Sequence, residues 1–173
     1  MNRILLIIAL FLICCFAACT KSTLFGPDQY KAQAKVDDSI VSKYIRSIGL
    51  QGKFKHVRNN DTIGVYYMII DSGTTNTLYT TSTQVTVGDT GRYINKDGVS
   101  ETQFYKTNNF NPSYTLASVI LGWQLGIPEC NAGGEVRLII PSRYAYGHYA
   151  QPDLNLPENA ILDFNIRIYS VTN

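Results

Sequence analysis

The sequence predicts an α+β domain with a separate helix in front of it. After residue 60 the chain is dominated by segments rich in β-branched and aromatic residues, which is the composition of strands. A single helical stretch interrupts these segments at residues 116–125. Before residue 50, apolar residues instead recur with helical spacing. Strands that lead to further strands, with one helix to cover their packed face, form an α+β arrangement.

Length and composition limit the chain to one ordinary domain with extensions. The 173 residues are 45% hydrophobic and 16% charged, a balance that excludes an intrinsically disordered chain. The formal net charge is only +2, so nothing in the charge balance indicates a nucleic-acid partner. Twelve tyrosines, seven phenylalanines and one tryptophan supply the side chains for an aromatic pocket.

The first 18 residues have the pattern of a secretory signal peptide. Arg3 is followed by an uncharged apolar run over residues 4–18, which ends in small residues. That run is shorter than the roughly 18 residues that a membrane-spanning helix needs. We therefore expect residues 1–18 to direct export and then to be removed.

The end of this leader resembles a bacterial lipobox, in which a cysteine receives lipid and becomes the mature N-terminus. Cys19 follows Phe16-Ala17-Ala18, although such sites commonly have an aliphatic residue where Phe16 stands. The resemblance implies a membrane-anchored lipoprotein with a tether over residues 19–27. The residue after Cys19 is Thr20 rather than an aspartate retention signal, which favours the outer membrane of a diderm bacterium. The alternative is an ordinary signal peptide with Cys19 as a bystander.

Residues 28–61 are expected to form a helical extension. Its apolar stripe comprises Ile40, Val41, Tyr44, Ile45 and Ile48. The segment is also basic, since residues 19–60 carry eight basic and three acidic side chains. We expect Asp37 or Asp38 to cap the start of the helix and Gly49 to end it. The basic segment either lies against anionic lipid headgroups or docks on its own domain or on a second copy.

The expected strands cover residues 63–70, 84–87, 93–94, 135–140 and 161–171, and residues 95–98 (NKDG) are a candidate hairpin turn. Polar and apolar side chains alternate along residues 161–171, so we expect one packed and one solvated face. The helical stretch at residues 116–125 is expected to lie across the packed face.

The common catalytic signatures are missing from the sequence. It has no GxSxG, HExxH or CxxC motif and no glycine loop that would cradle a phosphate. His56 and His148 are the only histidines, and neither has an obvious carboxylate partner for a metal site. Cys130 is the one cysteine beyond the leader and Cys19, and we expect a structural thiol there. Chemistry on this chain is therefore expected to need no metal, no cofactor and no nucleophile.

Four segments in series resemble the FKBP-type peptidyl-prolyl cis–trans isomerases: residues 119–127 (VILGWQLGI), 134–141 (GEVRLIIP), 145–147 (AYG) and 156–164 (LPENAILDF). The resemblance is strong over residues 114–171 and traceable over 62–113, which places the domain at 62–173. It implies a curved antiparallel sheet wrapped around one short helix. It also implies isomerisation of Xaa–Pro bonds, with proline-containing polypeptides as partners.

The resemblance also implies a role for each residue of the site. Trp123 would form the floor under the proline ring, and the backbone N–H of Ile120 would bind the peptide. Tyr146 would contribute its hydroxyl. The remaining implied contacts are the walls, the start of the covering helix and the overhanging loop: Phe164, Tyr114, Val119 and Leu156.

Several positions depart from the family pattern. Asp89 stands where an aromatic residue precedes a Thr-Gly pair, and Glu101-Thr102 stand where the family has Phe-Asp. Pro112 replaces another expected aromatic, so three pocket walls would be lost or polar. We therefore expect either a remodelled pocket, in which Phe104 or Tyr105 fills the gap, or a weak isomerase.

Three functions remain open at this point. The first is an isomerase that assists the folding of exported proteins. The second is a module that binds proline-containing or unfolded segments with little turnover. The third is a structural component of the cell envelope.

Overall fold

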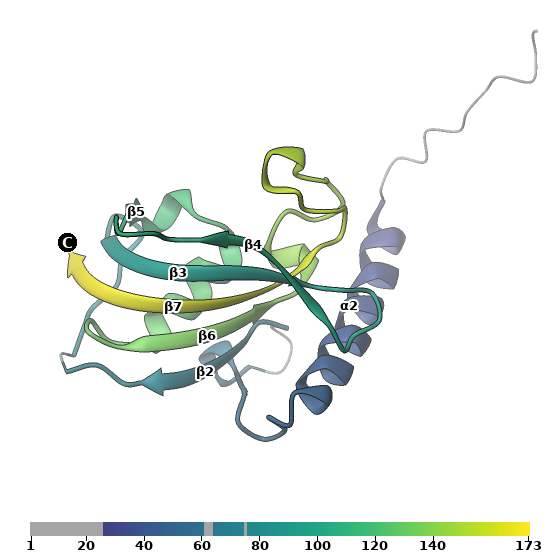
Figure 1. Ribbon diagram of the computed structural model, residues 1–173, viewed down its shortest axis with the longest axis horizontal. Helices are drawn as coiled ribbons and strands as arrows, with labels where there is room; N and C mark the ends of the chain where they lie inside the picture. The colour runs from purple at the N-terminus through teal and green to yellow at the C-terminus, as the bar shows by residue number, and fades with distance from the viewer. Residues whose placement is uncertain (1–25, 61–63, 75) are drawn as a thin grey trace, which may run out of the picture.

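The computed structural model describes residues 26–60, 64–74 and 76–173 (Figure 1). The expected signal peptide, Cys19 and most of the expected tether lie outside the described residues. Within the described ranges, no helix combines the length and apolar character that crossing a membrane requires.

The described residues form one curved, seven-stranded antiparallel sheet in the order β1-β2-β6-β7-β3-β4, with β5 paired to β3 (Figure 1). The long strands β3 and β7 form its centre and pair from Gln84↔Thr172 to Ile94↔Ile161. The strands are β1 (Lys55–His56), β2 (Tyr66–Asp71), β3 (Gln84–Ile94), β4 (Glu101–Lys106), β5 (Ser113–Thr115), β6 (Glu135–Ile140) and β7 (Ile161–Thr172). The expected curved antiparallel sheet is confirmed.

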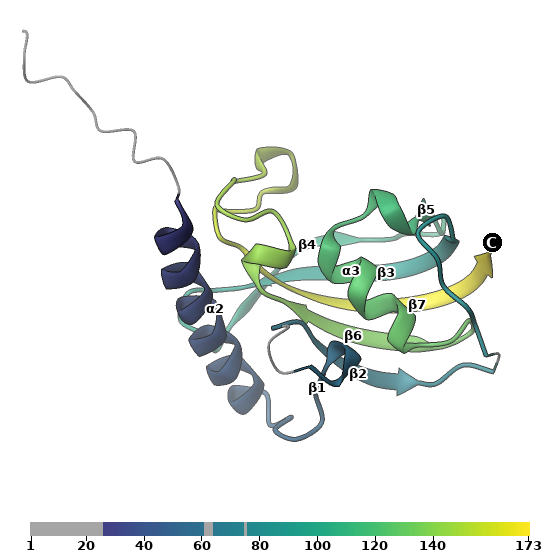
Figure 2. The ribbon, with the colours of Figure 1, turned by 180° about the vertical axis from the view of Figure 1, so that it is seen from behind.

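One face of the sheet, here called the inner face, carries the main core and the short helix α3 (Leu121–Gly126) (Figure 2). Leu162, Phe164, Ile166 and Ile168 point from β7 into this core, as the alternating pattern predicts. The helix lies very close to β6, because Gly122 and Gly126 face it. A side chain at either glycine would overlap Ile140 or Leu138 of β6.

The expected helix over residues 116–125 is wrong in one respect. The chain forms a 3-10 turn at Leu116–Ser118, becomes extended at Val119 (φ −95°, ψ 168°), and begins α3 only after Ile120. Val119 therefore lies outside the helix that it was expected to begin, and Ile120 takes the position before its first turn.

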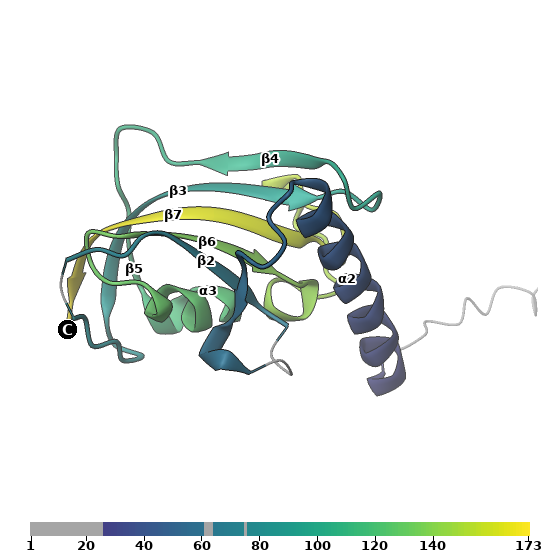
Figure 3. The ribbon, with the colours of Figure 1, turned by 90° about the horizontal axis from the view of Figure 1, so that it is seen from below.

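The helix α2 (Pro27–Ser47) lies across one end of the opposite face, here called the outer face (Figure 3). Val41 and Tyr44 of α2 pack with Ile94, Ile139 and Ile161 in a second, smaller core. The helix thus docks on its own domain, one of the alternatives that the sequence left open. This docking corrects the expectation of a solvated second face at one end of β7, where Ile161 and Asp163 are buried beneath α2, whereas Tyr169 near the other end is exposed.

The ends of α2 differ in how well the sequence predicted them. The helix begins at Pro27 after Gly26, so neither Asp37 nor Asp38 caps its start. Its last residue is Ser47, and Gly49 follows with a φ of +71°, which confirms the expected stop signal. The sheet also begins inside the expected helical extension, because Lys55 pairs with Tyr67.

The candidate turn at residues 95–98 is confirmed. The Gly98 N–H donates to the Asn95 carbonyl, and Gly98 has a φ of +64°. The turn joins β3 to β4, whose residues form a wall of the cavity described next.

Candidate active site

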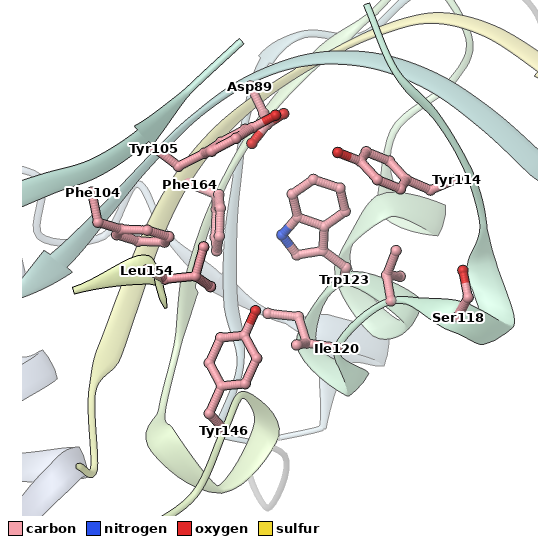
Figure 4. A pocket seen from close by; sticks show the side chains of 11 residues that line it. Asp89, Phe104, Tyr105, Tyr114, Ser118, Ile120, Trp123, Tyr146, Leu154 and Phe164 are labelled. Atoms are coloured by element: carbon pink, nitrogen blue, oxygen red, sulfur yellow. The ribbon is translucent and has the colours of Figure 1, made fainter. Parts of the chain in front are cut away.

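A cavity of about 330 Å³ opens between α3, the strands β3 and β4, and the loop between β6 and β7. Eleven residues line it (Figure 4). They are mostly aromatic or aliphatic: Asp89, Phe104, Tyr105, Tyr114, Ser118, Val119, Ile120, Trp123, Tyr146, Leu154 and Phe164. Seven of the eight pocket residues that the sequence analysis named are therefore brought together.

Trp123 lies at the bottom of the cavity and is held by the edges of its aromatic neighbours. Its ring centroid is 5.2 Å from that of Phe164 and 5.9 Å from that of Tyr114, both at nearly perpendicular angles. Such edge-to-face pairs stabilise each other by about 0.5–1.5 kcal/mol beyond their burial. The indole is 6% exposed, and its N–H has no partner among the described residues. The floor thus combines an apolar surface with one free donor.

A bulge in β4 supplies the side wall. Gly91 of β3 pairs with Tyr105 and Arg92 pairs with Gln103, which leaves Phe104 as the extra residue. In a regular strand, neighbouring side chains point to opposite faces. The bulge lets Phe104 and Tyr105 both line the cavity (Figure 4), so both candidates for a remodelled wall are in place.

Gly91 makes room for this wall. A Cβ atom at Gly91 would lie 2.7 Å from the Phe164 ring and 2.8 Å from the Phe104 ring. The two rings meet edge to face above it, with their centroids 5.7 Å apart. Any side chain at this position would have to displace one of the two rings from its place in the wall.

The departures at Glu101, Thr102 and Pro112 do not make the cavity polar, which corrects that expectation. None of the three lines it. Glu101 accepts a hydrogen bond from Tyr44 of α2 and forms an ion pair with Arg92 at 3.2 Å, so it belongs to the outer face. The expectation failed for Glu101 because it pairs with Ile94, which packs on the outer face, while Phe104 and Tyr105 supply the wall.

Leu156 does not overhang the site, and Leu154 lines it instead. Asn155 between them adopts a left-handed conformation (φ +53°), which turns the chain so that Leu156 enters the main core at 3% exposure. The sequence carried no signal that separated the two leucines, because both lie in the same loop two positions apart. Ser118, the other lining residue that was not predicted, directly precedes Val119.

Tyr146 projects its hydroxyl into the cavity from the side opposite Asp89 (Figure 4). Burial raises the pKa of this hydroxyl, so it stays protonated and remains a donor at neutral pH. Ile120 lies beside it, and no hydrogen bond among the described residues uses the Ile120 backbone N–H. The cavity therefore offers two donors close together.

The loop that carries Tyr146 is held from the outer face by α2. Asp37, which is fully buried, accepts hydrogen bonds from the Ser142 backbone N–H at 2.9 Å and from its hydroxyl at 2.7 Å. The Gly147 N–H in turn donates to the Ser142 carbonyl. A helix outside the cavity thus fixes one of its walls.

Asp89 is the only charged side chain among the eleven lining residues. It is 4% exposed, and its Oδ1 atom has no hydrogen-bond partner among the described residues. Burial raises the pKa of this carboxyl to about 6. None of the eleven described lining residues is a lysine or arginine that could compensate its charge.

The described residues provide little for other chemistry. They contain no group of three or more histidine, cysteine, aspartate or glutamate side chains placed to hold a metal ion. Cys130 is buried outside the cavity, and burial raises the pKa of its thiol to about 11, which makes it a poor nucleophile. What the cavity can do is bind an apolar ring and donate hydrogen bonds around it.

Comparison with known proteins gives one family for this sequence and fold. The sequence profile of the FKBP-type peptidyl-prolyl cis-trans isomerases matches residues 76–169. The FkpA isomerase of Buchnera aphidicola subsp. Schizaphis graminum is 33% identical over 110 residues, which are 64% of this chain and 42% of that protein. The chain spans half or less of the length of the curated relatives that it matches first.

Two solved structures resemble the fold. A peptidyl-prolyl cis-trans isomerase from Pseudomonas syringae pv. tomato superposes with a TM-score of 0.64 at 24% identity, covering 83% of this chain and 96% of the other. FkpA from Escherichia coli superposes with a TM-score of 0.60 at 26% identity, covering 83% of this chain and 66% of the other.

Proposed function

This chain belongs to the family of FKBP-type peptidyl-prolyl cis-trans isomerases, and from that premise we propose that it isomerises Xaa–Pro bonds in exported polypeptides. The observation that carries the proposal is the cavity itself. An indole floor, aromatic walls and two donors, the Tyr146 hydroxyl and the Ile120 N–H, converge on a space of about 330 Å³.

The reaction needs no proton transfer, which agrees with this set of side chains. Rotation about an Xaa–Pro bond faces a barrier of about 20 kcal/mol because the planar amide is stabilised by resonance. When the bond twists, resonance is lost and the amide becomes less polar. A pocket that binds the twisted form better than either planar form lowers the barrier by that difference. An apolar cavity favours the less polar twisted state over the planar one.

Each residue then has a defined part. The proline ring packs on Trp123 against Phe164, while Val119 and Tyr114 close the sides. The Ile120 N–H and the Tyr146 hydroxyl hold peptide carbonyls, so that the chain on one side of the bond stays fixed as the other side turns.

Exchange NMR on blocked Xaa-Pro peptides tests this function without a coupling protease. We expect micromolar protein to accelerate cis–trans exchange, and we expect Trp123→Leu to lower kcat/KM at least about tenfold, since the ring loses its platform. Phe110→Leu is a matched control, because Phe110 is 78% exposed and does not line the cavity. No acceleration by the unaltered protein would refute the proposal.

Binding without much turnover is the second candidate, and Asp89 is the observation that favours it. An unpaired carboxylate makes the cavity more polar and so weakens its preference for the less polar twisted amide. Saturable binding of a proline peptide without faster exchange would establish this alternative. Stable co-purification with one fixed envelope partner would instead favour a structural role.

We also propose export and lipid anchoring on the basis of the leader sequence. Removal of residues 1–18 would leave Cys19 as the lipidated N-terminus, with a short tether before α2 and attachment to the outer membrane. Cys19→Ala should release a soluble exported protein and abolish incorporation of labelled palmitate. Unchanged membrane retention would refute lipidation at Cys19.

A further inference from the structure

The starting observation is a charge that the fold leaves without a partner. Asp89 sits on the inner-face parity of β3 and points into the cavity beside Tyr105 (Figure 4). It is 4% exposed, and its Oδ1 atom accepts no hydrogen bond from any described residue. Only its backbone is tied down, through hydrogen bonds with Thr107. A buried ionised carboxylate without a partner costs free energy in the unbound protein.

The neighbours of Asp89 do not remove this cost. Tyr105 and Tyr114 are the titratable groups that approach it from β4 and β5, and the Tyr114 hydroxyl interacts with Tyr105. Burial, the Tyr105 interaction and the Asp89 charge raise the pKa of Tyr114 to about 12, so this hydroxyl is neutral at physiological pH. A group that enters with a positive charge would compensate the carboxylate, and the surrounding aromatic rings would favour it further.

We propose that Asp89 makes this cavity select polypeptides that carry a lysine or arginine beside the proline. The proline would occupy the indole floor, the alkyl part of the basic side chain would lie along the aromatic wall, and its charged end would reach Asp89. A metal ion is a poorer candidate, because a hard cation needs several oxygen ligands and Asp89 is the only carboxylate in the lining. This inference rests on the proposed function, since it concerns the same cavity.

The test compares two peptides that differ only in charge. Blocked peptides containing Lys-Pro or norleucine-Pro are followed by exchange NMR at about pH 7.5, where Asp89 is ionised and lysine is positive. We expect kcat/KM for the lysine peptide to be about tenfold higher, which corresponds to about 1.4 kcal/mol. Asp89→Asn should reduce this ratio to about one.

Two further measurements separate a local contact from other causes. Asp153→Asn removes a carboxylate from the exposed loop beside Leu154, outside the cavity lining, and should leave the ratio unchanged. The unaltered protein at about pH 5 should also lose the preference, because Asp89 becomes protonated while lysine keeps its charge. This second measurement does not depend on how Asp89→Asn folds.

The outcomes distinguish the inference from the function on which it rests. If the protein accelerates exchange but the lysine-to-norleucine ratio of kcat/KM is the same in the unaltered protein and in Asp89→Asn, the inference alone is overturned. It is also overturned if Asp153→Asn lowers that ratio as much as Asp89→Asn does. If exchange is not accelerated but chemical-shift titration shows tighter binding of the lysine peptide, the inference stands and isomerase activity is refuted. Absence of both acceleration and binding overturns both.

Discussion

The two faces of the sheet bury the same chemical group in opposite ways. On the outer face, Asp163 is fully buried and receives hydrogen bonds from Arg137, at 2.9 Å to Oδ1 and 2.5 Å to Oδ2, and from Tyr44 at 2.9 Å. On the inner face, Asp89 is nearly as buried, and its Oδ1 atom accepts no hydrogen bond from the part of the chain that the structure describes. Asp163 attaches α2 to the sheet through Tyr44. Asp89 makes no such contact with its side chain and instead faces the cavity.

Arg137→Met would test the outer face most severely. The substitution removes the cation and leaves Asp163 charged and buried, so we expect the free energy of unfolding to fall by about 3–5 kcal/mol. Urea denaturation measures the loss. The double variant Arg137→Met with Asp163→Leu should recover most of it, because no buried charge remains. A single variant within about 1 kcal/mol of the parent would contradict this account.

Asp37→Ala would test whether α2 secures the cavity loop. The Ser142 N–H and hydroxyl would then lack their acceptor, and we expect a loss of about 1–3 kcal/mol. Amide exchange of residues 142–147 should rise in parallel. Asp38→Ala is the matched control, because its ion pair with Arg143 at 2.8 Å lies at the surface and is worth only about 0–1 kcal/mol. Equal losses in both variants would refute the assignment to Asp37.

Asp89→Asn should change the free energy of unfolding least, and it should raise this free energy rather than lower it. Burial raises the pKa of Asp89 to about 6 in the folded protein, against a usual value of 3.8. Between these values the folded state binds more protons than the unfolded state, so the stability of the parent falls as pH rises through this window.

The asparagine variant has no such titration. We expect it to be about 1–2 kcal/mol more stable than the parent above about pH 7, with no advantage below about pH 4. Urea denaturation at the two pH values measures this difference. A variant less stable than the parent at neutral pH would show that Asp89 has a partner in solution.

The sequence predicted most of the sheet and the floor of the cavity because local patterns determine both. Alternation along β7 placed Phe164 on the inner face, and the segment around Trp123 identified the floor. It did not predict the burial of Asp163, because that depends on α2, more than a hundred residues away, docking on the other face. Asp37 was interpreted as a helix cap for the same reason, since its partner Ser142 is equally distant along the chain.

The cavity wall shows a second limit on what the sequence can predict. Hydrophobic periodicity, with a period of two for strands or 3.6 for helices, does not reveal a bulge or a left-handed residue. It therefore could not predict that Phe104 and Tyr105 face the same side, or that the chain turns at Asn155. Both come from backbone conformations at single residues. The left-handed Asn155 decides that Leu154 rather than Leu156 meets the cavity, and the bulge decides that Tyr105 meets it as well as Phe104.

The extra residue in β4 has an evolutionary consequence. Phe104 is the extra residue between two ladder pairs, so deleting it would leave Tyr105 paired with Gly91 and Gln103 paired with Arg92, and would remove one aromatic wall. Specificity in this scaffold can thus be rewritten by a single-codon insertion or deletion. Libraries that explore only substitutions at fixed length would never sample those variants.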